Sequence, residues 1–468
     1  MARAAERRAR WRRTARLARL TAGRGAAFAV HRARRVTAGE RRRAELDDGF
    51  ALRTAEHVAA ELGQMKGVLM KAGQLLGAIA EGLPQPAQDA LATLQADAPA
   101  MAPSLAEAVV RAELGAEPLA LFRRWDPVPV AAASIGQVHR AELFDGRAVA
   151  VKVQYPGVAD TFHGDLANAE LLYGLFSRLA LPGLDPRALV DELRARMVDE
   201  LDYRIEAANQ RAFGEFYAGH PFVRIPAVVP ERSTGRVLTS EWVDGLAWPA
   251  FLATASPAAR QRAGEIVLRF SQGSVHRFGR FNGDPHPGNY RFHPDGSVTF
   301  LDFGLVKRWA PGEWERLLPC LDAIVVDRDP LRLVDAMERV GFLQPGHGLD
   351  PRDVYAYVSC PYEPYLTDTF TFTRGFVAEA LGRVLDVRGP ARDVIRLLDM
   401  PASFVVLDRV VWGVSALLGR LEATGPWRAV LLEYRAGGAP ATPLGEADAA
   451  WWAQARQDGS AGAGRAIR

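Results

Sequence analysis

Cysteine and long apolar runs are both scarce in this chain of 468 residues. Its two cysteines, Cys320 and Cys360, exclude a disulfide scaffold and a cysteine-rich zinc module. The longest apolar run, from about Val410 to Gly419, is well short of the roughly 20 residues that span a bilayer. We therefore expect a cytoplasmic protein without a transmembrane span, which at most lies peripherally on the inner face of the cytoplasmic membrane.

Lysine is also rare, since only four of the 58 basic residues are lysine. In a chain this rich in arginine and alanine, lysine is retained mainly where a wide, planar guanidinium cannot replace a compact ammonium. The positions of the lysines are therefore candidates for function. They are Lys66, Lys71, Lys152 and Lys307.

Charge is distributed unevenly along the chain. Residues 1–43 contain fifteen arginines and two acids, a net charge of +13, so the remaining residues carry −10 to give the overall +3. A basic arm of this kind either binds an anionic membrane surface or is a solvated tail. We expect no specific nucleic acid partner and no export signal, because Arg24 interrupts the only candidate signal-peptide core.

Composition and periodicity divide the chain into five segments. Residues 46–82 carry an apolar helical face, a β-rich region with one or two long helices follows, and helical patterns then continue to about residue 436. This order predicts an α+β fold with two lobes and a cleft between them. The expected segments are a basic arm at 1–45, a helical extension at 46–115, a β-rich lobe at 116–243, a mostly helical lobe at 244–436 and a disordered tail, rich in glycine and alanine, at 437–468.

The same patterns predict individual elements. Asp145-Gly146 is typical of a hairpin turn. Strands are expected at 128–130, 137–143, 147–154, 225–231, 235–242, 289–293 and 297–301, and helices at 46–82, 87–95, 104–115, 158–180, 186–217 and 256–279.

Two motifs in the β-rich region resemble nucleotide-binding segments of kinases. The segment Ala131-Ala132-Ala133-Ser134-Ile135-Gly136-Gln137-Val138 fits G-x-G-x-x-G-x-V with alanine in the first two glycine positions. Val149-Ala150-Val151-Lys152 fits V-A-I-K, in which the strand lysine contacts the α- and β-phosphates of ATP.

A third motif supplies acids at the spacing that phosphoryl transfer needs. Asp284 and Asn289 are five residues apart, and Asp302-Phe303-Gly304 follows after a predicted hairpin. This chemistry uses an acid near the attacking hydroxyl, an asparagine ligand to one metal ion, and an aspartate that bridges Mg²⁺ to the phosphates. We therefore assign Asp284 as the catalytic acid or base and Asn289 and Asp302 as metal ligands.

Two further positions complete the predicted site. Lys152 needs a carboxylate partner, and we expect Glu206, from the helix at 186–217, to supply it. Glu241-Trp242-Val243 follows an apolar strand, so we expect Glu241 and Val243 to form the hinge beside adenine.

These residues carry a resemblance to the UbiB/AarF family of atypical protein-kinase-like proteins, which is linked to ubiquinone biosynthesis. Lys71-Ala72-Gly73-Gln74 matches its K-x-G-Q signature, Ala131 to Ser134 its alanine-rich nucleotide loop, and Glu200-Leu201-Asp202 its E-x-D motif. The resemblance covers residues from about 55 to 310, and in it the kinase-like positions are occupied by Lys152, Glu206, Asp284, Asn289 and Asp302.

The resemblance implies a bilobal, protein-kinase-like fold with an added N-terminal helical segment. That segment is expected to lie over the cleft, where Lys71 and Gln74 would meet the acids Glu200 and Asp202. It further implies binding of ATP or ADP with Mg²⁺, or with Mn²⁺, and ATPase activity more readily than protein phosphorylation. An isoprenoid or quinone-type ligand is a further implied partner.

Two other functions remain open at this point. Small-molecule kinases of the aminoglycoside or choline type carry H-G-D-x-H-x-x-N, to which Asn282 to Asn289 comes close, with His286 either catalytic or packed beneath the loop. The D-F-G and K-x-G-Q motifs favour the first interpretation. The other alternative is a nucleotide-sensing scaffold without turnover, which would need fewer of these residues.

Overall fold

The structure is a computed structural model that describes residues 101–133, 135–158, 199–386, 389–399 and 402–457. The basic arm, the K-x-G-Q residues Lys71 and Gln74, and Ser134 of the alanine-rich loop lie outside these residues. No helix within the described ranges is long and apolar enough to cross a membrane.

The smaller lobe contains a five-stranded antiparallel sheet with strand order β1-β3-β4-β6, in which β2 also pairs with β3. The β3–β4 hairpin turns at Asp145-Gly146, where Gly146 has a φ of +90° that suits glycine, so this prediction is confirmed. The strands are β1 (Arg124–Trp125), β2 (Ala131–Ala132), β3 (Gly136–Glu142), β4 (Ala148–Gln154) and β6 (Val237–Glu241).

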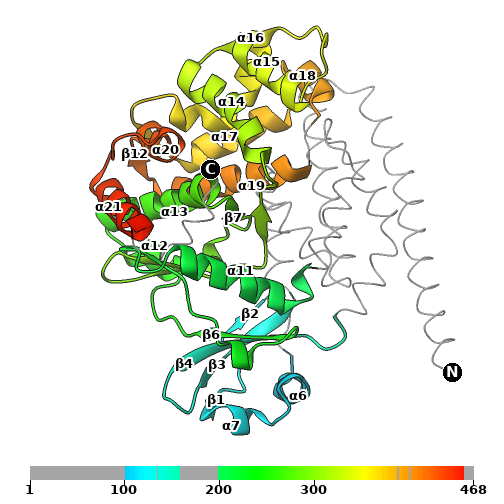
Figure 1. The fold of residues 1–468 in the computed structure, drawn as a ribbon, viewed down its shortest axis with the longest axis vertical. Coiled ribbons are helices and arrows are strands. Elements are labelled where there is room, and N and C mark those ends of the chain that lie inside the picture. The colour runs from blue at the N-terminus through cyan, green and yellow to red at the C-terminus, as the bar shows by residue number, and fades with distance from the viewer. Residues whose placement is uncertain (1–100, 134, 159–198, 387–388, 400–401, 458–468) are drawn as a thin grey trace, which may run out of the picture. The chain divides into compact units, whose positions relative to one another are not determined.

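Helix α6 (Pro103–Leu114) covers one face of this sheet (Figure 1). Alternate residues of β4 are buried, as expected for a strand with one apolar face, and α6 supplies the opposing side chains. The predicted boundary at residue 116 is therefore wrong, because α6 packs with the β-rich lobe and not with a separate extension. The shared core includes Ala106, Val109, Val110, Val149, Val151, Val153 and Val237, and the short α7 (Pro118–Leu121) follows α6.

Helix α11 (Tyr203–Phe216) lies between the sheet and the larger lobe (Figure 1). Asp202 caps it, with Oδ1 accepting a hydrogen bond from the backbone N–H of Arg204 at 3.0 Å. Asp202 itself has extended backbone angles, so the predicted continuous helix over 186–217 is wrong at this residue. The aspartate side chain competes for backbone N–H groups and begins a new helix.

Two predicted strands are displaced by proline. The strand expected at 128–130 forms instead as β2, and the strand expected at 225–231 is reduced to β5 (Val223–Arg224) followed by a 3₁₀ turn at Pro230–Arg232. Proline lacks a backbone N–H, and Pro127, Pro129, Pro226 and Pro230 remove donors that a strand would need.

The larger lobe is mostly helical, as predicted, and carries short strands beside the catalytic-loop motif. Its strands are β7 (Arg280–Asn282), β8 (Tyr290–Phe292), β9 (Val298–Phe300), β10 (Val306–Arg308), β11 (Phe370–Thr371) and β12 (Thr424–Gly425). Its helices are α12 (Trp248–Thr254), α13 (Pro257–Arg277), α14 (Glu313–Asp322), α15 (Pro330–Val340), α16 (Pro351–Val358), α17 (Arg374–Leu385), α18 (Arg392–Leu397), α19 (Ala402–Leu421), α20 (Trp427–Ala436) and α21 (Pro443–Gln457). Short 3₁₀ helices lie at Pro287–Asn289 and Cys360–Tyr365, and a π-helical turn lies at Ala323–Asp327.

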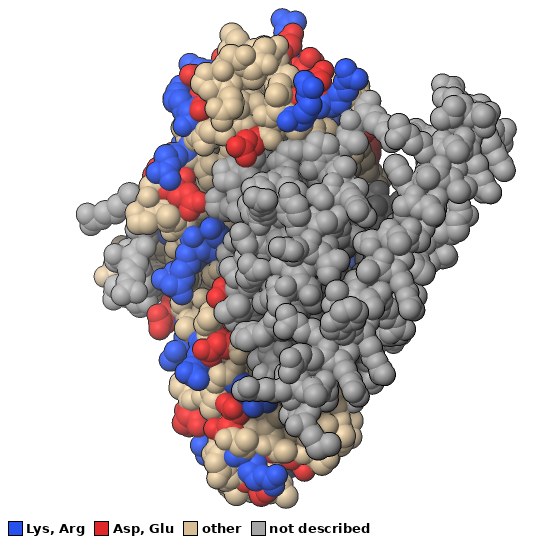
Figure 2. Space-filling model, turned by 90° about the vertical axis from the view of Figure 1, so that its right-hand side faces the viewer, with Lys and Arg blue, Asp and Glu red and all other residues tan. Residues whose placement is uncertain are grey.

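Packing in this lobe centres on α13 and α19, which contact each other and share one large core. Strand β7 pairs antiparallel with β10, and β8 with β9, so the chain from 280 to 308 folds as two short ribbons beside α13. On the described surface visible in Figure 2, acidic and basic side chains are interspersed, which is typical of a solvated face.

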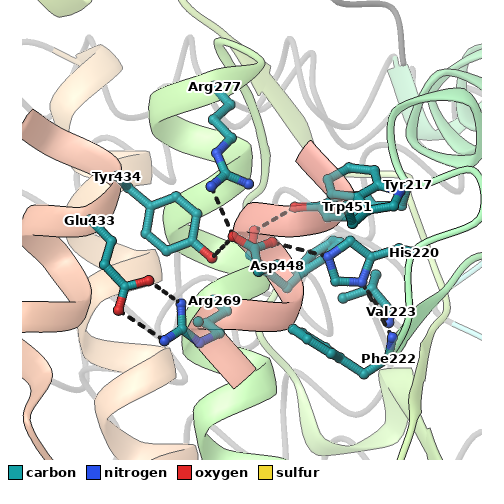
Figure 3. A network of polar contacts seen from close by, with 12 residues as sticks. Tyr217, His220, Phe222, Val223, Arg269, Arg277, Glu433, Tyr434, Asp448 and Trp451 are labelled. Carbon is teal, nitrogen blue, oxygen red and sulfur yellow. Dashed lines mark hydrogen bonds and ion pairs between the residues drawn. The ribbon is translucent and has the colours of Figure 1, made fainter. Parts of the chain in front are cut away.

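The C-terminal helix α21 corrects a prediction, since residues 443–457 are helical and docked where a disordered tail was expected. Asp448 of α21 is buried and accepts from Nε2 of His220 at 3.0 Å, Nη2 of Arg277 at 2.8 Å and the Tyr434 hydroxyl at 3.1 Å (Figure 3). One buried acid with three partners anchors this helix, although the alanine- and glycine-rich composition of residues 437–468 gave no such signal.

The partners of Asp448 determine its protonation. Burial alone would raise the pKa of Asp448, but the hydrogen bond from His220 and the charge of Arg277 outweigh it and lower the pKa to about 2. His220 accepts from the backbone N–H of Val223 through Nδ1, so its Nε2–H is the donor to Asp448. Burial lowers the pKa of His220, which keeps the imidazole neutral.

Asp448→Asn is expected to lower the free energy of unfolding by about 2 kcal/mol at pH 7, because the variant loses the interactions that lower the pKa of this carboxyl to about 2. A depressed carboxyl pKa stabilises the fold above the unfolded value near 4, and this stability is lost as the pH falls through about 2. The variant should therefore lose less stability than wild type between about pH 4 and pH 2. Thermal unfolding across this range tests the prediction, with the exposed Asp368→Asn as control; equal acid sensitivity of Asp448→Asn and wild type would contradict it.

Candidate active site

Lys152 of β4 brings together residues from three segments. Its Nζ donates to Oε1 and Oε2 of Glu206 at 2.8 and 2.9 Å and lies 3.4 Å from Oδ2 of Asp302. The Tyr203 ring centroid is 5.1 Å from the same Nζ. The expected pairing of Lys152 with Glu206 is therefore present, with Asp302 beside it.

The charges around Lys152 keep it protonated. Burial of the ammonium alone would lower the pKa of Lys152, but the carboxylates of Asp302 and Glu206 outweigh burial and hold it well above its ordinary value. The pKa of the buried Tyr203 hydroxyl is also raised, chiefly by burial, so this phenol is neutral. Lys152 is thus a permanent cation in the interior of the site.

Helix α11 and the D-F-G segment are connected by two contacts. The ring of Phe303 is fully buried, with its centroid 4.9 Å from that of Phe213. Asn209 donates from Nδ2 to the Phe303 carbonyl at 3.1 Å. These contacts determine where Glu206, on the same helix, meets Asp302.

Asp302 has an unusual backbone conformation. Its φ is +58°, in the left-handed region that non-glycine residues rarely adopt, and such strain is common at functional sites. Its Oδ1 accepts from the Gly304 N–H at 3.0 Å, and its carbonyl accepts from Nδ2 of Asn282 at 2.7 Å. A Cβ atom at Gly304 would lie only 3.3 Å from Oδ1 of Asp302, so the glycine keeps this turn tight.

The loop after β7 presents Asp284 and Asn289 together. Nδ2 of Asn289 donates to the backbone carbonyl of Asp284 at 3.1 Å and to its Oδ2 at 3.2 Å. The Asp284 N–H donates to Oδ1 of Asn282 at 2.8 Å. Asn282 therefore bridges the two acidic motifs, since its amide nitrogen contacts Asp302.

The alanine-rich loop begins as part of the sheet. Ala131 and Ala132 are exposed and pair with Val138 and Gln137 of β3, and the Ala133 N–H donates to the Gly136 carbonyl at 2.8 Å. A Cβ at Gly136 would lie 2.3 Å from the Val153 carbonyl oxygen, so only glycine permits this approach to β4. Val138 lies directly opposite Lys152.

The predicted hinge residues lie where β6 ends. Glu241 is the last residue of β6 and is exposed, and Val243 is partly buried in the connection to α12. The Glu241 N–H donates to the Ala227 carbonyl at 2.8 Å, and the N–H of Trp242 donates to the Ala148 carbonyl at 3.0 Å. The connection between the lobes thus starts on the strand next to that of Lys152.

The E-x-D acids lie at the start of α11. Asp202 caps the helix, and the Glu200 carbonyl lies 3.5 Å from Nε2 of Gln154, which donates to the Leu201 carbonyl at 2.9 Å. Their expected partners, Lys71 and Gln74, lie outside the described residues, so that contact stays a prediction.

A divalent cation in phosphoryl transfer takes one or two carboxylates and completes its shell with phosphate and water oxygens. The carboxylate of Asp302 and the amide oxygen of Asn289 fit such a donor set. Within the described ranges, no group of three His, Cys, Asp or Glu side chains forms a metal cage. The two oxygen donors of Asp302 and Asn289 are of the type that Mg²⁺ and Mn²⁺ prefer.

A family model described as the ABC1 atypical kinase-like domain matches residues 93–337, just over half of the chain. The chain belongs to this ABC1 family. The UbiB/AarF resemblance and the kinase-like α+β fold are confirmed; residues 46–100 of the expected N-terminal helical extension lie outside the described residues. The matched range includes α6, in agreement with its place on the sheet.

The relatives of this ABC1 chain include plant and bacterial proteins. ACTIVITY OF BC1 COMPLEX KINASE 8 of Arabidopsis thaliana, named chloroplastic, is 33% identical over 288 residues, which are 59% of this chain and 37% of that protein. An aarF domain-containing protein kinase of the same plant is 29% identical over 393 residues, 81% of this chain and 54% of that protein. The chain thus spans about half or less of the length of these relatives.

A solved structure covers more of the chain. Rv3197 of Mycobacterium tuberculosis, determined as a complex with erythromycin, is 32% identical and has a TM-score of 0.61. The match covers 84% of this chain and 98% of that one.

Two residues of the candidate site, Asn282 and Arg409, are not among those that the sequence motifs predict, and for His286 the motifs allow two roles. Asn282 belongs to a loop pattern, in which an amide next to Gly283-Asp284 is a local signal. Arg409 of α19, whose Nη2 lies 2.5 Å from Oδ1 of Asp284, had no local signal because 125 residues separate the two. His286 is exposed, and its Nδ1 accepts from the Gly288 N–H at 3.1 Å, so it does not pack beneath the loop.

Proposed function

We propose that this chain is an atypical, kinase-like ATPase that binds ATP with Mg²⁺ between its two lobes. The observation that carries the proposal is the meeting of Lys152, Glu206 and Asp302, in which a buried lysine is charged and aimed at the aspartate expected to hold the metal ion. Membership of the ABC1 family supports it.

Each side chain of the candidate site then has a specific role in binding ATP or in phosphoryl transfer. Lys152 would bind the α- and β-phosphates, with Glu206 holding the ammonium in place. Asp302 and Asn289 would bind Mg²⁺, which neutralises charge that develops on the phosphates. Asp284 would accept the proton of the attacking hydroxyl or water, and the backbone of Glu241 to Val243 would meet adenine beside Ala131 to Val138.

Phosphate release from ATP by the purified full chain, with and without Mg²⁺, tests this proposal directly. Mg²⁺-dependent turnover that is lost in Asp284→Asn and kept in Asp368→Asn is the expected result. Absence of both Mg²⁺-nucleotide binding and turnover in the wild type would overturn it, and binding without turnover would favour a sensing scaffold.

A second candidate is transfer to a hydroxylated small molecule. The observation that favours it is the erythromycin complex of Rv3197, which matches 84% of this chain. Incubation with ATP and either erythromycin or an aminoglycoside, followed by mass spectrometry, separates the candidates. Gain of one phosphoryl group by the compound supports transfer, and phosphate released only to water supports the ATPase.

The proposal extends to a membrane surface and an isoprenoid or quinone-type ligand, both implied by the family resemblance and the basic arm. ATP turnover should then rise with anionic liposomes or with phenolic isoprenoid compounds. Removal of residues 1–45 should abolish the increase in ATP turnover with liposomes and leave the increase with isoprenoid compounds unchanged.

Ala133→Gly is expected to change the ratio of ATP to ADP affinity by about two- to fivefold and to raise autophosphorylation. Glycine would loosen the loop by about 0.5–1 kcal/mol and remove a methyl group from the phosphate approach. Calorimetric ATP and ADP affinities with radiolabel incorporation test this, with the exposed Ala258→Gly as control. Unchanged ATP and ADP affinities and unchanged labelling would show that alanine at position 133, in place of the glycine of the kinase pattern, has no effect on nucleotide binding or transfer.

A further inference from the structure

Helix α19 places an arginine on the loop that carries Asp284. Nη2 of Arg409 lies 2.5 Å from Oδ1 of Asp284, and the two side chains are only 12% and 15% exposed. Arg409 lies beyond residues 93–337, the range that the ABC1 family model matches. The larger lobe therefore adds a cation to the loop from outside the matched domain.

One face of α19 holds this arginine against the loop. A Cβ at Gly283 would lie 3.0 Å from Cγ1 of Val406, and a Cβ at Gly413 would lie 2.3 Å from Cγ of Pro285. Val406, Arg409 and Gly413 follow at spacings of three and four, so they share one side of the helix. Close packing on both sides of Arg409 leaves the guanidinium little freedom to move away from Asp284.

The loop itself has no permanent cation. Its sequence, Asp284-Pro285-His286-Pro287-Gly288-Asn289, lacks lysine and arginine, and the exposed His286 caps Gly288. Phosphoryl transfer spreads negative charge over the transferred group, and positioned cations stabilise that charge. Lys152 contacts Glu206 and Asp302, and among the described residues Arg409 is a cation that contacts Asp284.

The second guanidinium nitrogen of Arg409 is unsatisfied. Nη1 is buried and has no hydrogen-bond partner among the residues that the structure describes. A buried donor on a charged group is unfavourable without an acceptor, and such groups in native proteins contact a water, an ion or a ligand, or have a functional role. With Nη2 on a carboxylate, the planar fork of arginine leaves Nη1 for a second anionic oxygen.

We propose that Arg409 is a catalytic residue that bridges Asp284 to the transferred phosphoryl group. The inference rests on the proposed ATPase function and names one residue of its chemistry. Nη2 orients Asp284, and Nη1 binds an oxygen of the γ-phosphoryl group. A bond forms from the water oxygen to the γ-phosphorus, the bond from phosphorus to the β–γ bridging oxygen breaks, the water proton passes to Asp284, and ADP leaves with the bonding pair. Arg409 remains protonated throughout.

Turnover and binding together test this role in the full chain. Arg409→Gln should lower kcat for ATP hydrolysis by about 100-fold or more, the range seen when a charge-stabilising donor is removed. Mg²⁺-ADP affinity should stay within about twofold, because ADP lacks the γ-phosphoryl group. Binding of Mg²⁺-ADP with aluminium fluoride, which mimics that group, should weaken in parallel with kcat. Arg409→Lys should retain intermediate activity, and Arg420→Gln, at an exposed position of the same helix, should behave as wild type.

Several outcomes would overturn the inference while leaving the proposed function in place. Wild-type kcat in Arg409→Gln would show that the arginine is dispensable, and raised kcat would show that it restrains Asp284. Equal losses of Mg²⁺-ADP affinity and kcat would indicate a purely structural ion pair. If Arg409→Gln does not fold, Arg409→Lys decides: reduced kcat at an unchanged melting temperature supports the role, and wild-type kcat excludes it. A wild type that binds no Mg²⁺-nucleotide would instead overturn the proposed function itself.

Discussion

Asp302→Asn is expected to weaken Mg²⁺-ATP binding by about 100-fold or more and to abolish turnover. Removing one of the two protein ligands proposed for the metal ion takes away a full negative charge, which is worth several kcal/mol in such a site. Asparagine is well suited to the positive φ of residue 302, and its amide oxygen can still accept from the Gly304 N–H. The substitution therefore changes charge with little disturbance of the turn.

Titration calorimetry of Mg²⁺-ATP, with melting temperatures as a check on folding, measures this effect. Asp368→Asn is a suitable control because that aspartate is exposed and remote from the motifs. Unchanged Mg²⁺-nucleotide affinity in Asp302→Asn would remove the assignment of this residue as the metal ligand.

Local motifs account for most of what the sequence predicted correctly at the site. The hairpin at Asp145-Gly146, the loop from Asp284 to Asn289 and the D-F-G segment each depend on residues close together in the chain. A buried ammonium needs a carboxylate, so charge balance predicted a partner for Lys152 on the helix expected at 186–217. That helix offers seven acids, and the choice of Glu206 among them also depended on the resemblance to kinase-like proteins.

Features that depend on distant packing could not be predicted in this way. Arg409 is one of 54 arginines, and only the contact of α19 with the loop distinguishes it from the others. The composition of the C-terminal segment that contains α21 predicts a disordered tail, and only the contacts of Asp448 with His220, Arg277 and Tyr434 explain why this helix is docked. The sequence around Asp202 is compatible with a continuous helix and with a new helix that Asp202 caps. The sequence alone therefore did not predict that α11 begins after Asp202.

Lys152→Met is expected to abolish ATP turnover and to lower the free energy of unfolding by about 3–5 kcal/mol, the usual cost of removing one partner of a buried ion pair. In the variant, the carboxylates of Glu206 and Asp302 face each other without the cation that now lies between them. Protonation of a carboxyl relieves such repulsion, so the stability deficit relative to wild type should shrink as the pH falls from about 7 to about 5.

The double variant Lys152→Met with Glu206→Leu separates stability from chemistry. Replacing both members of a buried ion pair with apolar groups is often neutral or stabilising, so most of the lost stability should return. Turnover should not return, because the phosphates would still lack their lysine. Lys307→Met, at a partly buried lysine of β10 outside the ion-pair cluster, should keep both stability and turnover. Denaturant unfolding and phosphate release measure the two quantities on the same samples. Recovery of turnover in the double variant would mean that Lys152 serves only to neutralise Glu206, and its proposed contact with the α- and β-phosphates would then be wrong.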